Sequence, residues 1–575
     1  MRKQTKVVAV ASAAALLAIG ASMTSFAATG WVEEDGQWYF YDKDGNRVED
    51  EWKKSGDNWY WLDSEEGGAM AIDKLVEDDD DTYYVDGNGV MVTNTWVKVV
   101  NEDQDDDDDP AEYHYYYMQS NGKAYKGDGT SVSKKTIDGK RYAFDEDGVM
   151  LYGWVTESGT MANGEDEWSA SDVMYYFGGW EDGSMKTGWQ KITVHDNADG
   201  KDDDYDYWFN FKSNGQKRTH SKEDDTWKSN SRYYHFDERG VMVYQWFETA
   251  TTNSASASNW AYFSSPEDGA RVTKGWFKVV APTEDNSFLE SDVTFAKKDS
   301  DDESERWYYS DSKDDGLVVG EIKKIKGKYY GFWPDDGQKG GRMLIGLCAL
   351  QMNESDGSKI DKVIMADMDS DDLDDFMDTY GTKSQEETGI YLYYFGDGED
   401  GSMKTGSVSL NLDGDSYQFQ FKKTGAADSR GRGVNGVDDG KYIYKYGQKV
   451  KADTDDKYTL VYANGNINDS NVVVEDFDNS DIKGIAKTFD LAAKDGSDED
   501  NLRGYCGFGT AQEGWYLVNT SGRIQTGTKS GTKDGYDMYW FMYKDNIKFY
   551  ADDKNISDYD ELKGDGWHSY FDNLK

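Results

Sequence analysis

Aromatic side chains alternate with polar ones over short segments that end in Asp-Gly or Asn-Gly pairs. Residues 37–41 read Gln-Trp-Tyr-Phe-Tyr, and the turn sequence Asp-Lys-Asp-Gly follows at 42–45. Because successive side chains of a strand point to opposite faces, Trp38 and Phe40 share one face and Tyr39 lies on the other. Asp-Gly pairs supply the positive-φ positions that a tight hairpin needs. The pattern therefore predicts aromatic β-hairpins.

The hairpin pattern recurs along the chain. A Trp, a tight turn, an aromatic strand and an Asp-Gly turn begin at Trp31 and start again at Trp52, and residues 175–188 and 393–406 are nearly identical. We count about a dozen units, lengthened by insertions rich in Asp, Ser and Lys. An isolated hairpin is marginally stable, so the units must stack to bury their rings. The predicted fold class is all-β, a solenoid-like array of stacked β-hairpin repeats with irregular acidic loop insertions.

Four segments are predicted along the chain. Residues 1–27 are expected to be a signal peptide, since cationic residues precede an apolar run that ends in small residues. Residues 28–345 hold hairpin repeats, residues 346–505 hold degenerate repeats with insertions, and residues 506–575 form a C-terminal repeat-like segment. No later apolar stretch is long enough to cross a bilayer, so we expect no membrane span after signal removal.

Composition narrows the function classes. The chain has 63 Lys and Arg against 112 Asp and Glu, a formal net charge of −49. Nucleic acid is excluded as a partner, because phosphate contacts need clustered cations. Only 4 Pro occur beside 61 Gly, which excludes collagen and Pro-rich disorder. The apolar surface is carried by 20 Trp, 42 Tyr and 23 Phe, so the predicted core is a row of stacked rings.

The phased aromatic units resemble a known family. Gly30-Trp31 precedes Trp38-Tyr39-Phe40, and Gly188-Trp189 precedes Tyr207-Trp208-Phe209. This outline is similar to the cell-wall-binding repeats, which include the choline-binding repeats of Gram-positive surface proteins, clostridial toxin repeats and streptococcal glucan-binding repeats. The resemblance implies aromatic grooves between successive hairpins for choline or sugars. The ligand-binding residues expected on this basis are Trp31, Trp38, Tyr39, Trp52, Trp59, Trp154, Trp189 and Trp276.

The function implied by the resemblance is non-covalent attachment to the cell envelope. We expect a secreted, non-catalytic protein of the cell surface or cell wall, whose partner is a choline-bearing polymer or a neutral polysaccharide; choline and sugar stay open. Ring faces suit a quaternary ammonium, which has no hydrogen to donate. The net charge disfavours a bare polyanion. The alternatives are a surface adhesin or scaffold that binds proteins, and a wall-modifying enzyme whose catalytic part lies within 346–505.

Acidic runs offer a second candidate chemistry. Three of them, Asp78–Asp81, Asp105–Asp109 and Asp202–Asp204, fall in predicted loops and are expected to be solvated. Calcium is the one metal considered, and its candidate ligands in loop register are Asp367, Asp369, Asp371 and Asp378. The register lacks the central Gly and the final Glu of such loops. Residues 367–380 are also predicted to form a short helix.

Catalysis finds little support in the sequence. None of the 5 His residues stands in a His-Glu-x-x-His pattern, and no cofactor is expected. Cys348 and Cys506 are the only thiols, and they form either one disulfide or two unpaired, small apolar side chains.

Overall fold

The computed structural model describes most of the chain: residues 29–102, 104, 110–197, 201–220, 227–248, 260–282, 304–312, 316–335, 340–425, 429–494 and 500–573. The predicted signal peptide and the run Asp105–Asp109 lie outside these ranges. Two compact units are formed, residues 1–244 with 265–270 and residues 245–264 with 271–575. No helix in the described ranges has the length and apolar character that crossing a bilayer requires.

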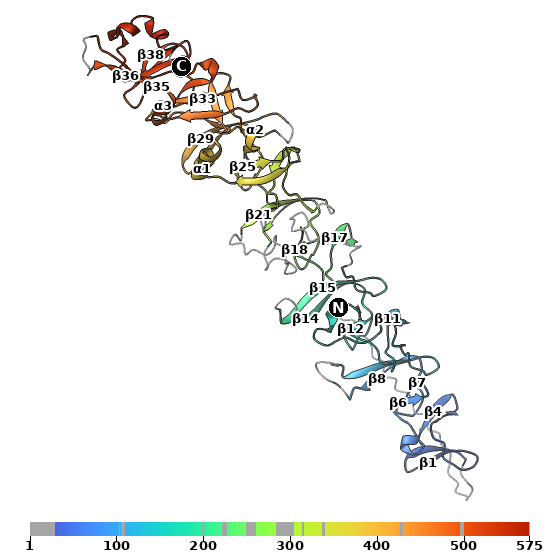
Figure 1. Cartoon of the computed structure of the whole chain (residues 1–575). Coiled ribbons are helices and arrows are strands. Elements are labelled where there is room, and N and C mark those ends of the chain that lie inside the picture. The colour runs from blue at the N-terminus through green and yellow to red at the C-terminus, as the bar shows by residue number, and fades with distance from the viewer. Residues whose placement is uncertain are drawn as a thin grey trace. The chain divides into compact units, whose positions relative to one another are not determined.

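The first unit consists of antiparallel hairpins that follow one another in chain order (Figure 1). Its first five strands share one sheet in the order β1-β2-β5-β4-β3, and each later hairpin, from β6-β7 to β16-β17, is a separate two-stranded sheet. The strands are β1 (Gly30–Glu34), β2 (Gln37–Tyr41), β3 (Glu51–Ser55), β4 (Asn58–Asp63), β5 (Ala69–Met70), β6 (Lys74–Asp78), β7 (Asp81–Val85), β8 (Thr95–Val100), β9 (Tyr113–Met118), β10 (Lys135–Ile137), β11 (Lys140–Tyr142), β12 (Trp154–Thr156), β13 (Val173–Tyr176), β14 (Gly188–Asp196), β15 (Asp203–Phe211), β16 (Trp227–Ser229) and β17 (Arg232–Tyr234).

The second unit begins with small hairpin sheets like those of the first unit, and its later strands form larger sheets. The sheets up to β24 are β18-β19, β20-β21-β22 and β23-β24; the later ones have the orders β26-β25-β27, β28-β29-β32-β31-β30, β34-β33-β37 and β35-β36-β40-β39-β38. The strands are β18 (Gln245–Glu248), β19 (Trp260–Phe263), β20 (Gly275–Val280), β21 (Glu305–Ser312), β22 (Gly316–Leu317), β23 (Ile322–Ile325), β24 (Lys328–Gly331), β25 (Leu347–Met352), β26 (Ile360–Met365), β27 (Ile390–Tyr394), β28 (Gly406–Leu412), β29 (Asp415–Phe421), β30 (Gly436–Asp438), β31 (Tyr442–Lys445), β32 (Gln448–Lys449), β33 (Tyr458–Ala463), β34 (Val474–Phe477), β35 (Lys487–Leu491), β36 (Leu502–Cys506), β37 (Trp515–Asn519), β38 (Lys529–Lys533), β39 (Tyr539–Tyr543) and β40 (Asn546–Ala551).

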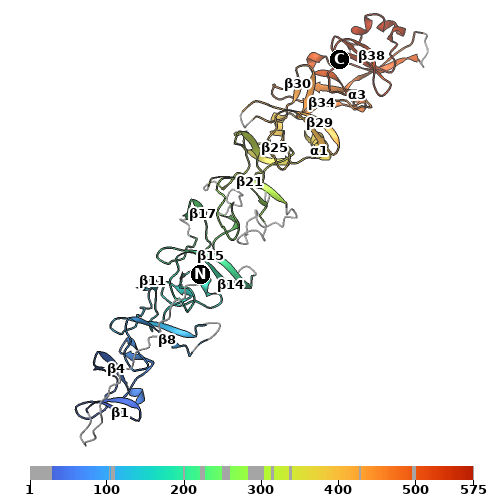
Figure 2. The same ribbon diagram turned by 180° about the vertical axis from the view of Figure 1, so that it is seen from behind.

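Three α-helices occur in the described part of the chain, all in the second unit: α1 (Ser370–Tyr380), α2 (Gln385–Thr388) and α3 (Asn479–Ile485). The prediction of a helix at 367–380 is confirmed by α1, which lies beside β29 in Figures 1 and 2. Its Phe376 packs into a buried cluster with residues of β28 and β29. The other two were not predicted. Their local signal is capping, since Ser384 caps α2 and Asp478 opens α3 with a capping box.

A recurrent backbone hydrogen bond joins many of the hairpins to the one before. After the Asp-x-x-Gly turn, the chain returns along its own hairpin and pairs with it in a single bridge, as Met91 does with Val85. We call the residue at this bridge, or at the corresponding place after the turn, the return residue. The N–H of Met91 donates to the carbonyl of Trp59 in the preceding hairpin at 2.9 Å. The same bond is made by the return residues Ala124, Met150, Met185, Lys217, Met242, Met343 and Met403, to Thr82, Tyr115, Arg141, Met174, Trp208, Trp307 and Tyr329 respectively.

Most of the turn glycines pack on the return side chain of the unit before them. Gly122 has φ +87°, and a Cβ built there would lie 2.5 Å from the Sδ of Met91. Gly89 meets Met70 in the same way, at 2.7 Å from its Cε. The first Asp of each turn fixes the loop, since Asp86 Oδ1 accepts the N–H groups of Asn88 and Val90 at 2.8 and 2.9 Å. These contacts hold consecutive hairpins in one register. The predicted stack of β-hairpins is therefore confirmed.

Both cysteines are free and buried. Cys348 and Cys506 belong to two separate core clusters of the second unit, so of the two alternatives the unpaired one is confirmed. Complete burial raises the pKa of the Cys348 thiol to about 12.

A methyl group on Gly122 should separate two repeats. The Gly122→Ala variant is expected to lose roughly 1–3 kcal/mol of unfolding free energy in urea, because the new Cβ overlaps Met91 and the backbone has a positive φ. Gly87→Ala is the matched control, since a Cβ there meets nothing within 4 Å. Equal stability of the two variants would contradict the packing role of the turn glycine.

Neither thiol should react in the native chain. The thiolate is the reactive form, and burial holds both groups in the neutral form. Titration with a chromogenic disulfide reagent is expected to find no reactive thiol before denaturation and two afterwards. Detection of none after denaturation would indicate a disulfide and contradict the structure.

Candidate functional site

Aromatic rings gather at the junctions between consecutive hairpins. At several junctions, a Trp on the first strand of one hairpin lies edge to face against a ring on the second strand of the next. Ring centroids are 5.3 Å apart for Trp31 and Tyr60, and 5.1 Å for Trp52 and Tyr83. Comparable pairs are Trp96 with Tyr142, Trp189 with Tyr234, Trp246 with Tyr308 and Trp276 with Tyr330. The strand alternation seen in the sequence produces this arrangement, because both partners lie on the stacking face.

The predicted ligand-binding rings differ in how far they face solvent. Trp31, Trp38, Trp52, Trp189 and Trp276 are half-buried. Trp59 is exposed over 39% of its surface. The ring of Tyr39 is buried, and the Arg47 guanidinium carbon lies 3.8 Å above its centroid. Trp154 is 6% exposed. Six of the eight rings therefore retain solvent-facing surface.

The junction of β3-β4 with β6-β7 combines packed and open rings. Trp52, Trp61 and Tyr83 form a cluster on which the side chain of Met91 packs. The Nε1–H of Trp52 is buried there and has no acceptor among the described residues. Trp59, on the same strand as Trp61, is the exposed member, with the Lys54 ammonium 5.8 Å from its ring centroid. The junction thus offers the exposed ring of Trp59 beside a cluster of packed, buried rings.

A cavity of about 310 Å³ lies beside another junction, in the second unit. Its apolar walls include Trp307, Trp333 and Met343. Trp307 packs edge to face on the predicted Trp276 at 6.2 Å, and its buried Nε1–H has no acceptor among the described residues. Three acidic and three basic side chains complete the charged lining: Glu305, Asp367, Glu399, Lys278, Arg306 and Arg342. This mixture suits a small ligand with an apolar cation and an anionic group.

Sequence reasoning did not select Trp307 and Trp333. Twenty-four residues separate the paired strands β20 and β21, yet Trp276 stands directly opposite Tyr309 in their register. A signal for Trp307 was present, since it opens an aromatic triplet, Trp307-Tyr308-Tyr309. Trp333 carries no repeat signal.

The described acidic runs lie where solvent reaches them. The prediction that they lie in loops holds only in part: Asp78 ends β6, Asp81 begins β7, and Asp203 and Asp204 begin β15, with only residues 79–80 in the turn between β6 and β7. Asp81 pairs with Lys123. Asp202 and Asp204 lie 3.5 and 3.3 Å from the ring of His195. Although partial burial of His195 opposes protonation, its hydrogen bond to Asp204 and the nearby Glu165 and Asp202 carboxylates raise its pKa.

Three of the four calcium candidates lie on helix α1 or at its N-cap. Asp369 caps α1 by accepting the N–H of Asp372 at 2.8 Å, and Asp371 and Asp378 lie on α1 itself. In the described ranges, no group of three or more His, Cys, Asp or Glu has a geometry that could hold a metal. Calcium binding at Asp367, Asp369, Asp371 and Asp378 stays a prediction.

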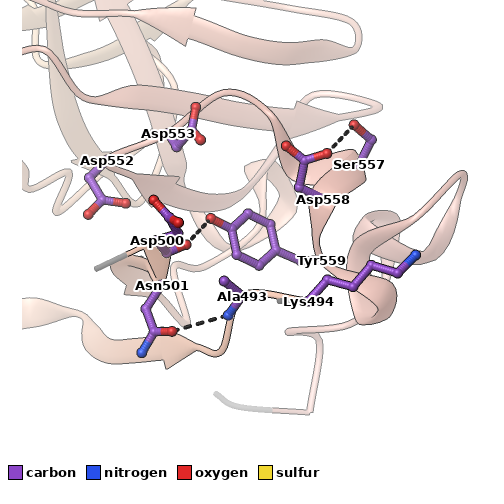
Figure 3. Close-up of a pocket in the computed structure, with 9 residues that line it drawn as sticks. All are labelled: Ala493, Lys494, Asp500, Asn501, Asp552, Asp553, Ser557, Asp558 and Tyr559. Carbon is purple, nitrogen blue, oxygen red and sulfur yellow. Dashed lines mark hydrogen bonds between the residues drawn. The ribbon is translucent and has the colours of Figure 1, made fainter. Parts of the chain in front are cut away.

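A larger cavity of about 540 Å³ near the C-terminal end is acidic (Figure 3). Its lining includes Asp500, Asp552, Asp553 and Asp558. Its one ring, Tyr559, donates its hydroxyl hydrogen to the Asp500 carbonyl at 2.7 Å, as Figure 3 shows. This cavity presents no group of ring faces, unlike the hairpin junctions.

Comparison with known proteins finds a family match for the N-terminal repeats. Residues 28–74 match the sequence model of the choline-binding repeat. No curated protein matches the chain. Similar solved structures are CbpJ from Streptococcus pneumoniae TIGR4 (17% identity, 55% of this chain and 94% of that one, TM-score 0.33), the choline-binding domain of CbpL from Streptococcus pneumoniae (23%, 38% and 88%, 0.23), and the modular autolysin LytC from Streptococcus pneumoniae with a synthetic peptidoglycan ligand (16%, 58% and 57%, 0.27).

At these identities and TM-scores, the structural similarities say nothing about what this chain binds. The sequence match rests on the segment that holds Trp31, Trp38, Tyr39, Trp52 and Trp59. The predicted resemblance to the cell-wall-binding repeat family is therefore confirmed, on the choline-binding repeat matched by residues 28–74.

Proposed function

We propose that the protein is exported and attaches non-covalently to choline-bearing polymers of the cell wall, through aromatic junctions, without catalytic activity. The observation that carries this function is the grouping of a Trp, a facing ring and a return Met that recurs at several junctions. At the β3-β4 junction the exposed Trp59 lies on the same strand as Trp61 of this group, within the segment that matches the choline-binding repeat.

The chemistry of the junctions favours a quaternary ammonium. Such a cation has no hydrogen to donate, so ring faces are its best partners, worth about 0.5–2 kcal/mol per contact. A single shallow site would bind weakly. Several junctions on one chain, engaging a polymer that repeats the same decoration, gain avidity because later contacts are intramolecular.

The charge of the chain and of the cavity at Trp307 both favour a zwitterionic group. A chain of net charge −49 is repelled by an undecorated polyanion. The cavity supplies Trp307 and Trp333 for a cationic end and Arg306 and Arg342 for an anionic one, while Lys278 is paired with Glu399 at 3.0 Å. Phosphocholine combines both charges within one small group.

A neutral glycan is the second candidate ligand. The observation that favours it is the exposed face of Trp59, because a flat exposed ring also stacks against a sugar. Free choline should displace the protein from a wall if choline is the ligand, and glucan oligomers should displace it if a glycan is the ligand.

The mature chain should sediment with choline-bearing walls and be released by free choline in the millimolar range. Sodium chloride at the same ionic strength is the necessary control, because an acidic chain binds cationic surfaces unspecifically. The neutral isostere 3,3-dimethylbutanol should release much less protein. Release by glucan oligomers and not by choline would assign the sites to sugar. Capture of surface proteins with no wall binding would favour an adhesin, and wall lysis in a zymogram would contradict the non-catalytic role.

Single ring deletions should weaken individual choline sites. In Trp59→Ala and Trp307→Ala, loss of one ring contact is expected to raise the dissociation constant of that site roughly 2–30-fold in a choline titration followed by calorimetry. Tyr536→Ala is the control, since Tyr536 is 55% exposed and has no place at these junctions. Unchanged titrations for both Trp variants, in folded protein, would remove these junctions from the site.

A further inference from the structure

The junction of β12-β13 with β14-β15 contains a buried ammonium. Lys217 is 1% exposed, and its Nζ lies 5.4 Å from the ring centroid of Trp154. The same Nζ donates to the Trp168 carbonyl at 3.3 Å. Buried lysines are rare unless partners compensate the desolvated charge. The rings and this carbonyl are such partners.

Lys217 stands where most repeats carry methionine. As a return residue it forms the bridge with Phe211 that Met242 forms with Phe236. Its N–H donates to the Met174 carbonyl at 2.7 Å, the bond that other return residues make. The turn glycine of the following repeat, Gly240, packs on its stem, because a Cβ there would lie 2.6 Å from the Lys217 Cδ. The substitution therefore keeps the stacking contacts and adds a charge at the end of the side chain.

Four buried rings cluster beside this position, and the Lys217 ammonium faces the ring of one of them, Trp154. Trp154 lies 5.0 Å from Phe209, 6.1 Å from Phe211 and 6.2 Å from Trp168, between ring centroids. Each of the four is at most 6% exposed. We call this group the Trp154 cage. It has the composition of a site for an apolar cation, and it is closed to solvent.

The charges around the cage are nearly balanced. Asp237 is buried and accepts from the Arg239 Nε at 2.9 Å, while Arg239 also pairs with the buried Asp196 at 2.9 Å. Burial, and after it the Arg239 guanidinium, lower the pKa of Lys217 to about 8, and the Asp237 and Asp172 carboxylates oppose this shift. The geometry suits the ammonium form, since Nζ faces the Trp154 ring and donates to a carbonyl.

We propose that Lys217 is the built-in occupant of the Trp154 cage, so that this junction takes no external ligand and becomes a site for a small quaternary ammonium when the lysine side chain is removed. The inference rests on the rings and on Lys217, and it holds whether or not other junctions bind choline. It assigns Trp154 an internal cation in place of the wall ligand that the sequence predicted.

Chemical rescue tests the assignment. In Lys217→Ala, tetramethylammonium is expected to raise the unfolding temperature and to bind roughly tenfold or more tightly than it does to the wild-type cage, with 3,3-dimethylbutanol as the neutral probe. Lys217→Met, which refills most of the space without charge, and Lys212→Ala, which removes an exposed lysine, are the controls. Binding of tetramethylammonium at other junctions should raise the unfolding temperature of the wild type and of all three variants equally. The test is therefore the additional rise in Lys217→Ala.

Two results would overturn the proposal. One is rescue of Lys217→Ala no larger than that of the controls, and the other is equal rescue by 3,3-dimethylbutanol, which would mean an apolar cavity without cation preference. A second measurement does not depend on the alanine variant folding. The wild-type proton spectrum should contain a lysine Hε resonance shifted upfield by the Trp154 ring and absent from Lys217→Met; its absence from the wild type would place the ammonium elsewhere.

Discussion

The hydrogen bond from each return residue to the hairpin before it determines the rest of the structure. A two-stranded hairpin of four or five residues per strand cannot bury its own rings. The bond from Met91 to Trp59, and its equivalents, place one hairpin's tryptophan against the next hairpin's tyrosine. The turn glycine then closes on the return side chain. Ring clusters, register and ligand-sized junctions all follow from this one repeated contact.

Much of this arrangement is readable from the sequence, because it is local. Strand alternation at 37–41, the Asp-Gly turns and the helix at α1 depend on residues a few positions apart. The sheets after β25 were not predicted, since pairs such as β33 with β37 join strands far apart in the chain. Trp333 was missed for the same reason, because only the folded junction brings it beside Trp307. The second role of the turn glycines, contact with methionine, has no signal within a single unit.

The aromatic junctions differ in whether a ring keeps an open face. Arg47 covers Tyr39, Arg218 lies 4.1 Å above Trp227, and Lys217 lies against the buried Trp154. Trp59 and Trp307 also have a lysine near them, Lys54 at 5.8 Å and Lys278 at 6.0 Å from the ring centroid, yet Trp59 is 39% exposed and Trp307 lines a cavity. The same attraction between a cation and a ring serves stability in the first set and is available to a ligand in the second. Under the proposed function, the choline sites are therefore fewer than the repeats.

The most direct test of this account is a crystal structure of the mature chain soaked with choline. We expect trimethylammonium density against the Trp52 and Trp59 rings and in the cavity beside Trp307 and Trp333, with Lys217 still in the Trp154 cage. Choline density at none of these junctions, or choline in place of the Lys217 ammonium, would contradict it.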